Sequence, residues 1–200
     1  MLNELSHNGL LETWMRMRAV IKNGYGGPEV LQLVDVDRPE IVDPHDVLVR
    51  VRAAGVNYSD VHTRRVAFDG YEALQSRVGN NPESQPFRDA PGHIPGLDGA
   101  GVVEAIGPAV TRFAQGDHVY YVDGGFGPHD GNYAQFKVVD EQYLAPKPAS
   151  MDFATAAAIP TALITAWEAL YDRAGIKAGQ FVVVHGGAGS VGHFLSLIHI

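Results

Sequence analysis

The sequence predicts a mixed fold, a β-barrel followed by the opening of an α/β unit, and three observations support that prediction. Short runs rich in β-branched residues, separated by Gly, Pro and Asp turns, fill residues 17–145. An alanine-rich stretch with helical spacing begins after Pro148. A short apolar run then leads into a glycine-rich turn. An all-β pattern therefore gives way to an α/β pattern, and we expect a domain boundary near residue 148.

Six apolar runs predict the strands of the barrel. In the third run, Val47, Val49 and Val51 alternate with more polar positions, which gives one face to a core and the other mostly to water. Turn signals such as Gly116-Asp117 separate the runs. This spacing is typical of a compact, partly closed barrel. The predicted strands are, in order, Met17–Lys22, Val30–Val36, Val47–Ala53, Gly101–Ile106, His118–Val122 and Tyr133–Val139.

Helical periodicity follows the barrel. The stretch Met151–Ile159 is rich in alanine, and Gly175 is a plausible helix stop. We expect one helical face to carry the larger apolar side chains that recur at spacings of four and seven or eight: Leu163, Trp167 and Leu170 or Tyr171.

The segment Phe181–His185 is predicted to be a strand that opens a GxGxxG turn. In such a turn Gly187 allows the tight bend, Gly189 lets backbone approach a pyrophosphate, and Gly192 lets the next helix pack closely. Backbone N–H groups of the helix start, at Ser190 and Val191, would face the phosphates. Glycine turns also occur wherever backbone doubles back, and the preceding apolar run favours the dinucleotide alternative.

Composition excludes several classes of function. The formal charge of −8 argues against nucleic acid or an anionic membrane as a partner. No apolar run approaches the ~18 residues of a membrane span. The chain has no cysteine, so disulfides, a thiolate nucleophile and a cysteine metal site are excluded. This composition fits a reducing compartment, and we expect a cytoplasmic protein.

Several motifs together resemble the zinc-independent quinone oxidoreductase group of the medium-chain dehydrogenase/reductase superfamily. They run in the family's order from about residue 17 to 192, which is far more specific than any single motif. They are Ala54–Asp60, Pro95–Gly101, Gly116–Val119, Gly131–Ala134, the alanine-rich helix leading to Thr165 and the final glycine turn.

The resemblance implies a GroES-like β-barrel that bears the substrate side of the site, followed by a Rossmann-type domain that binds NADPH, with NADH as an alternative. We expect a disordered leader over 1–16, the barrel over 17–148 and an incomplete Rossmann domain over 149–200. The acidic or basic residue that separates NAD from NADP is expected ~20 residues past the glycine turn. We therefore interpret the chain as a truncated form with weak or absent cofactor binding, whose activity the sequence leaves open.

The resemblance also implies the site residues. Asn57 and Tyr58 would donate hydrogen bonds to the substrate oxygen, Asp60 would complete the catalytic segment, and Thr165 would contact the nicotinamide carboxamide. An alternative is that Asn57 and Asp60 only organise a turn, and that Thr165 is an ordinary helix residue. Tyr133 either lines an aromatic slot with Tyr71 or belongs to the barrel core.

No metal site is predicted. Zinc-dependent relatives carry cysteine and histidine in the segments where this chain has Asn57 and Leu97, and neither residue is a good zinc ligand. The remaining candidates, His62, His93 and His118, match no metal-binding spacing.

The predicted function is hydride transfer from NAD(P)H to a quinone or an activated carbonyl or enoyl compound, with no metal ion. An enoyl-thioester reductase is the nearest rival within the enzymes, and a non-catalytic GroES-like binding or structural module is the alternative from another class. The partner would be a small-molecule substrate, and the resemblance implies a full-length homodimer. The segment 66–94 is longer than the family's loop and is either a lid or a variable surface loop.

Overall fold

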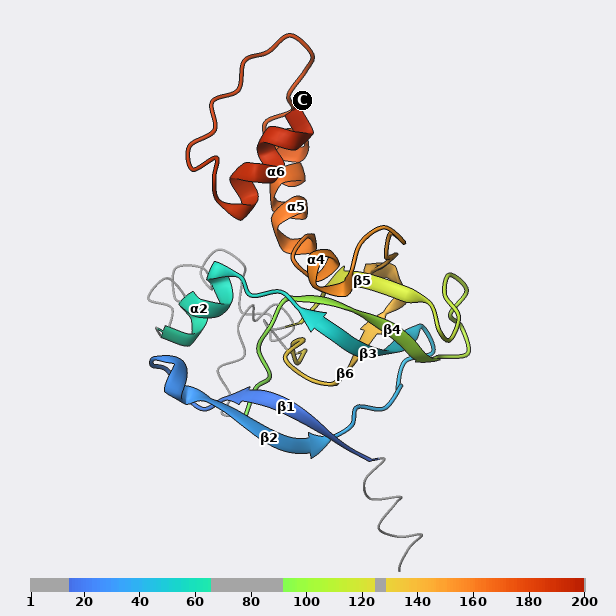
Figure 1. Ribbon diagram of the computed structural model, residues 1–200. Coiled ribbons are helices and arrows are strands. Elements are labelled where there is room, and N and C mark those ends of the chain that lie inside the picture. The colour runs from blue at the N-terminus through green and yellow to red at the C-terminus, as the bar shows by residue number, and fades with distance from the viewer. Residues whose placement is uncertain (1–14, 66–91, 125–128, 200) are drawn as a thin grey trace, which may run out of the picture.

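A computed structural model describes residues 15–65, 92–124 and 129–199 (Figure 1). The predicted leader and the 66–94 loop lie largely outside these ranges. The elements in chain order are β1 (Arg16–Lys22), β2 (Leu31–Asp37), β3 (Asp46–Ala54), α2 (Tyr58–Arg65), β4 (Asp98–Ile106), β5 (His118–Val122), β6 (Phe136–Asp140), β7 (Leu144–Pro146), α4 (Phe153–Ala157), α5 (Pro160–Trp167), the π-helical turn η4 (Glu168–Arg173) and α6 (Ser190–His199), with 3-10 turns at Pro28–Val30 and Glu141–Tyr143.

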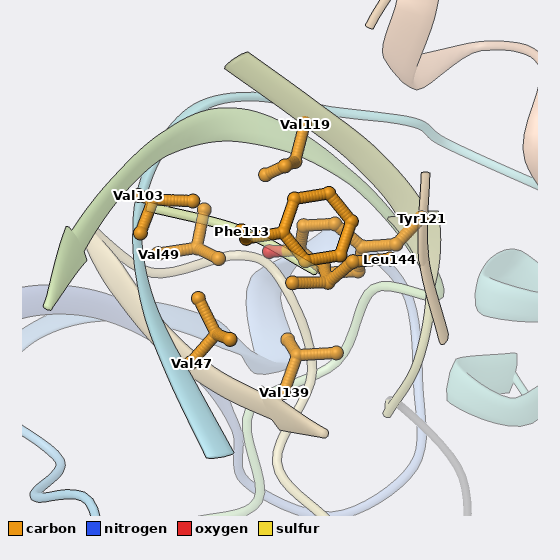
Figure 2. Packing of buried hydrophobic residues seen from close by; sticks show 8 residues of the cluster. All are labelled: Val47, Val49, Val103, Phe113, Val119, Tyr121, Val139 and Leu144. Carbon is orange, nitrogen blue, oxygen red and sulfur yellow. The ribbon is translucent and has the colours of Figure 1, made fainter. Parts of the chain in front are cut away.

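The main sheet has five antiparallel strands in the order β6-β3-β4-β5-β7. Its longest pairing joins β3 to β4, from Val47 opposite Ile106 to Ala54 opposite Gly99, with two register shifts that bend the pair. The turn into β5 uses Gly116 at a φ of +95°, a conformation that favours glycine. The strands curve around one apolar cluster, as a partly closed barrel does (Figure 2).

The barrel core is that cluster. Its side chains come from every strand of the main sheet and from the loop between β4 and β5, and Val47 and Val49 are fully buried as the alternation predicts. Burial of each such side chain contributes roughly 1.5–3 kcal/mol. The members shown in Figure 2 are Val47, Val49, Val103, Phe113, Val119, Tyr121, Val139 and Leu144.

A second, two-stranded ribbon forms from β1 and β2 and lies below the main sheet in Figure 1. Backbone hydrogen bonds join β1 to the segment that precedes β6, where the N–H of Val20 donates to the carbonyl of Tyr133 at 2.7 Å. Buried Met17, Ala19 and Ile94 fill the space between ribbon and sheet. The ribbon therefore holds the segment that carries Tyr133 through backbone hydrogen bonds.

The helices after the barrel begin at a well-formed cap. The Asp152 side chain accepts a hydrogen bond from the Thr155 N–H at 2.6 Å, which satisfies one of the free donors at the start of α4. Ala156 and Ala157 of α4 pack on Ala100 of β4, because such small side chains let helix and sheet approach closely. The predicted helix Met151–Ile159 is thus a shorter α4, and α5 follows it.

The predicted apolar face of the next helix is partly wrong. The buried positions are Ala162, Ala166 and Leu170, whereas Trp167 and Tyr171 are exposed and pack on each other with ring centroids 4.5 Å apart. The helices α5 and α6 lie side by side (Figure 1), and alanine permits this close approach. The predicted stop is confirmed, since Gly175 follows the π-helical turn with a φ of +58°.

The predicted strand at Phe181–His185 is wrong. Residues 180–184 have no regular structure, Phe181 is fully exposed and Val183 is largely exposed. A strand needs a neighbouring strand to pair with its N–H and C=O groups, and none of the described residues lies in that position. All six predicted strands are present to within three residues at either end, but β1 and β2 form the separate ribbon, and β7 of the main sheet was not predicted.

Candidate active site

Asn57 lies where the chain leaves β3 and enters α2. Its backbone N–H donates to Oδ2 of Asp60 at 2.8 Å, so Asp60 reaches back over the first turn of the helix as the acidic partner of a capping box does. The side-chain amide of Asn57 points elsewhere, and its Nδ2 donates to Oδ2 of Asp98 at 2.9 Å. The local turn and the orientation of the amide thus depend on two different carboxylates.

Tyr58 is the first residue of α2 and is 81% exposed. Its ring stacks on His62, one turn along the same helix, with centroids 6.0 Å apart. The phenol is therefore accessible from solvent. Tyr58 follows Asn57 in the chain, so two residues with neutral donor groups occupy consecutive positions at the junction of β3 and α2.

Asp60 is buried and has a second donor. The Tyr133 hydroxyl donates to Asp60 Oδ2 at 3.2 Å, which connects the segment before β6 to the start of α2. Burial raises the pKa of Asp60, and the nearby charge of Asp98 raises it further, while the hydrogen bonds from Asn57 and Tyr133 oppose the shift. Tyr133 thus helps to hold the Asp60 carboxylate in place. Burial of Tyr133 also raises the pKa of its own phenol.

Asp98, the first residue of β4, was not among the predicted site residues. Its side chain is almost completely buried, with 1% exposed. Oδ1 accepts from the Thr161 N–H at 2.9 Å and from the Thr161 hydroxyl at 2.6 Å, while Oδ2 accepts from Asn57. Burial raises the pKa of Asp98, and these donors partly offset the shift. The signal for it in the sequence is a lone carboxylate within an apolar and glycine-rich stretch, between Leu97 and Gly99.

Thr165 lies one turn after Thr161 on α5 and is exposed. Its hydroxyl donates to the carbonyl of Thr161 at 2.7 Å. Hydrogen bonds therefore run without interruption from Asn57 through Asp98 and Thr161 to Thr165. Asn57, expected on the substrate side, is thus connected to Thr165, expected on the cofactor side. The connection runs through Asp98 and Thr161, which were not predicted from the sequence.

The predicted glycine turn is present at the start of α6. The Gly189 N–H donates to the carbonyl of Gly186, which has a φ of +75°. A Cβ on Gly192 would collide with the Gly186 carbonyl oxygen, so the helix packs closely on the turn, whereas Gly187 faces open space. Ser190 and Val191 begin the helix, where backbone N–H groups have no intrahelical acceptor. Free N–H groups at the start of a helix are the donors that anions such as phosphate use in proteins.

Metal-binding side chains do not gather in the part of the chain that the structure describes, where no three His, Asp or Glu could share an ion. His93 lies beside Asp130 with 3.3 Å between Nδ1 and Oδ1. His118 packs against Phe153, and His62 against Tyr58. The three candidate histidines thus lie in three different environments.

A cavity of about 620 Å³ lies between the β1–β2 ribbon and β6. It is lined by Asp37, Asp46, Ile94, Asp130, Phe136 and Lys137 among others. None of the predicted site residues lines it. The candidate active site lies instead where hydrogen bonds of Asp60 and Asp98 join the ends of β3, β4, α2 and α5.

Comparison with known proteins identifies the family. Residues 43–149 match the alcohol dehydrogenase GroES-like domain. The chain belongs to the medium-chain dehydrogenase/reductase superfamily. The match covers the barrel from the residues before β3 to the turn before α4, and includes Asn57, Tyr58, Asp60 and Asp98.

Individual members of the superfamily resemble the chain over most of its length. A quinone oxidoreductase of Lama guanicoe is 35% identical over 176 residues, covering 88% of this chain and 47% of that protein. An alcohol dehydrogenase superfamily protein from Novosphingobium aromaticivorans is 36% identical with a TM-score of 0.76, covering 91% of this chain and 49% of that one. A mycobacterial protein complexed with NADPH is 29% identical with a TM-score of 0.70, covering 90% and 48%.

The chain therefore spans about half the length of the medium-chain dehydrogenase/reductase relatives that it matches. The half that it covers contains the GroES-like barrel and the first helices that follow it. Among the described residues, no helix has both the length and the apolar character to cross a membrane.

Proposed function

We propose that this chain belongs to an NAD(P)H-dependent oxidoreductase that transfers hydride to a quinone or to another activated carbonyl or enoyl compound, without a metal ion. Membership of the superfamily and the similarity to a quinone oxidoreductase support the reaction class. The observation that carries the proposal is a pair of neutral donors at consecutive positions at the start of α2, the oriented amide of Asn57 and the exposed phenol of Tyr58.

The chemistry of the acceptor explains why neutral donors suit the site. Hydride addition to a quinone or an enone leaves negative charge on the substrate oxygen, which donors must stabilise and a proton must neutralise. One Nδ2 hydrogen of Asn57 is held by Asp98, and the second is available to the substrate. The Tyr58 hydroxyl, on a side chain that is open to solvent, would donate the proton.

The cofactor is proposed to be NADPH, with NADH as the alternative. A relative that binds NADPH shares the fold, which supports a nicotinamide cofactor. The glycine turn and the start of α6 would hold its pyrophosphate, and Thr165 would meet the carboxamide. When bound, the nicotinamide supplies the hydride. The Thr165 hydrogen is already donated to Thr161, so its hydroxyl oxygen would act as an acceptor toward the cofactor.

A kinetic assay tests the reaction class. The natural protein that contains these residues should oxidise NADPH in the presence of 1,4-naphthoquinone, and a chelator should leave the rate unchanged. Asn57→Ala and Tyr58→Phe should each lower kcat/KM by about 10²-fold or more, as loss of an oxyanion donor does elsewhere. Arg65→Lys, at the far end of α2, serves as the matched control.

Each alternative has its own outcome in this assay. No oxidation with any quinone, together with turnover of an α,β-unsaturated thioester, would replace the quinone by an enoyl substrate. No oxidation with either acceptor would favour a non-catalytic GroES-like module. Loss of activity on chelation would contradict the metal-free reaction.

Cofactor binding by the 200 residues alone is expected to be weak or absent, because the segment before the glycine turn forms no strand to support it. Titration of NADPH against tryptophan fluorescence measures this directly. Saturable binding in the micromolar range would contradict the expectation. Homodimer formation by the whole protein is a further part of the proposal, and light scattering would measure it.

A further inference from the structure

Helix α5 begins without a cap of its own. The residue at its N-cap position is Ile159, whose side chain can accept no hydrogen bond, and Pro160 follows it. The first turn of a helix nevertheless needs acceptors for its free N–H groups. Asp98 supplies one from β4, because its Oδ1 accepts the N–H of Thr161 at 2.9 Å. The helix is therefore capped by a residue 63 positions earlier in the chain.

The same carboxylate decides which way the Asn57 amide faces. An ionised carboxylate can only accept hydrogen bonds, so the Asn57 amide must turn Nδ2 toward Asp98 and Oδ1 away from it. A neutral amide in place of Asp98 would remove this constraint, since an amide can present either a donor or an acceptor. One side chain thus fixes both a helix start and an amide orientation.

Burying the Asp98 carboxylate would destabilise the fold if packing were the only role of this residue. Asp98 is 1% exposed, and the three hydrogen bonds that it accepts come from the neutral groups of Thr161 and Asn57. A buried carboxylate is destabilising unless hydrogen bonds replace its water. The positive end of the α5 dipole adds a favourable interaction at Thr161. The Asp98 carboxylate also repels the nearby carboxylate of Asp60.

From these contacts we infer that Asp98 is a positioning residue, which orients the Asn57 amide and fixes its position relative to Thr165 through the first turn of α5. This relative position matters because the reaction needs a substrate oxygen and a cofactor ring at fixed separation. The effect on the reaction rests on the proposed function, whereas the orientation of Asn57 and the capping of α5 do not depend on it.

Nuclear magnetic resonance of the 200-residue chain tests the orientation without any assay of activity. One side-chain amide proton of Asn57 should be shifted downfield and protected from solvent exchange, and it should show a nuclear Overhauser contact with Thr161. In Asp98→Asn both the shift and the protection should be lost. Asp152→Asn makes the same change at the cap of the neighbouring helix α4, and it should leave the Asn57 signals unchanged.

A second variant keeps the test decisive if Asp98→Asn does not fold. Thr161→Val removes only the hydroxyl that donates to Asp98 and retains the backbone N–H. It should reduce the downfield shift and the protection of the Asn57 amide proton without abolishing them. Unprotected Asn57 amide protons in the unaltered chain, or signals that Thr161→Val leaves in place, would overturn the inference.

Kinetics of the natural protein then test whether the position of Asn57 relative to Thr165 matters for the reaction. If it reduces quinones, Asp98→Asn should lower kcat/KM by about 10- to 100-fold, mainly through kcat, with Asp152→Asn within about twofold of the unaltered protein. An active protein that Asp98→Asn leaves unchanged would overturn the positioning role. If the resonance signature is present and no quinone or enoyl compound is reduced, the orientation stands and the proposed function fails.

Discussion

The side-chain amide of Asn132 lies 2.8 Å from the carbonyl oxygen of Leu97, and this contact holds the loop that delivers Asp98 to the start of β4. The same Nδ2 also reaches the carbonyls of Gly96 and Asp123, at 3.2 and 2.8 Å. Asn132 is almost fully buried, so water cannot replace these bonds. A residue outside the candidate site thus fixes the backbone on which Asp98 depends.

Asn132→Ala should lower the free energy of unfolding by about 2–4 kcal/mol, because buried carbonyl oxygens lose their donor. Urea unfolding followed by circular dichroism measures the change. Asn23→Ala is the matched control, since the Asn23 amide bonds to Gln32 in an exposed position, and it should stay within about 0.5 kcal/mol. A loss below about 1 kcal/mol for Asn132→Ala would contradict the role given to it.

Gly99→Ala should destabilise the barrel by roughly 1–3 kcal/mol, the usual cost of overpacking. A Cβ at this position would lie 2.6 Å from both Asn132 Oδ1 and the Tyr121 ring, and both neighbours are buried. Thermal unfolding of the two proteins gives the comparison. Gly187→Ala meets open space and should leave the midpoint unchanged; equal effects of the two substitutions would show that the Gly99 site can relax.

Local pattern was enough to predict every strand of the main sheet except the three-residue β7. The segment His118–Val122 coincides with β5, and the alternation at Val47 and Val49 correctly assigns the buried face. Both features are set by neighbours one or two positions apart in sequence. Pattern failed at Phe181–His185, where strand formation depends on pairing partners that an apolar run does not specify.

The candidate site was only partly predictable for a related reason. Asn57, Tyr58 and Thr165 came from resemblance to a family, whereas Asp98 and Thr161 carry no spacing signal. Their contact joins positions 63 residues apart, and only the folded backbone brings them together. Helical spacing also could not decide between two faces of α5, because small alanines pack there in preference to Trp167.

Leu144→Ala should cost about 2–5 kcal/mol, the range for truncating a buried leucine. Leu144 is 2% exposed and packs in the barrel cluster (Figure 2). Leu33→Ala, at a position 65% exposed on β2, should change the free energy of unfolding by less than about 0.5 kcal/mol. Denaturant titration of both variants tests the assignment of the core, which similar losses for the two would refute.

Stability should depend on pH through Glu141. Its Oε2 accepts from the backbone N–H groups of Thr111 and Arg112, at 3.1 and 3.0 Å, and these bonds lower the pKa of Glu141 below its ordinary value of 4.5. A lowered pKa in the folded state stabilises the protein above pH 4.5, and the contribution is lost as the pH falls through the lowered value.

Glu141→Gln should therefore lower the Tm at pH 7 and have less effect as the pH falls from about 5 to 3. Differential scanning calorimetry at several pH values measures the two proteins side by side. His45, with Nδ1 3.6 Å from Oε1, also contributes to the lowered pKa of Glu141. A Tm difference that does not vary with pH would assign the effect to packing instead.

The ribbon of β1 and β2 shares backbone hydrogen bonds with the chain around Tyr133, and this sharing has a consequence for local opening. Separation of the ribbon from the main sheet would break the backbone hydrogen bonds that Val20 and Gln135 donate. Amide hydrogen exchange in the ribbon and in the segment around Tyr133 should therefore be correlated. Since the Tyr133 hydroxyl steadies Asp60, a fluctuation that begins at the N-terminal hairpin would reach the first turn of α2.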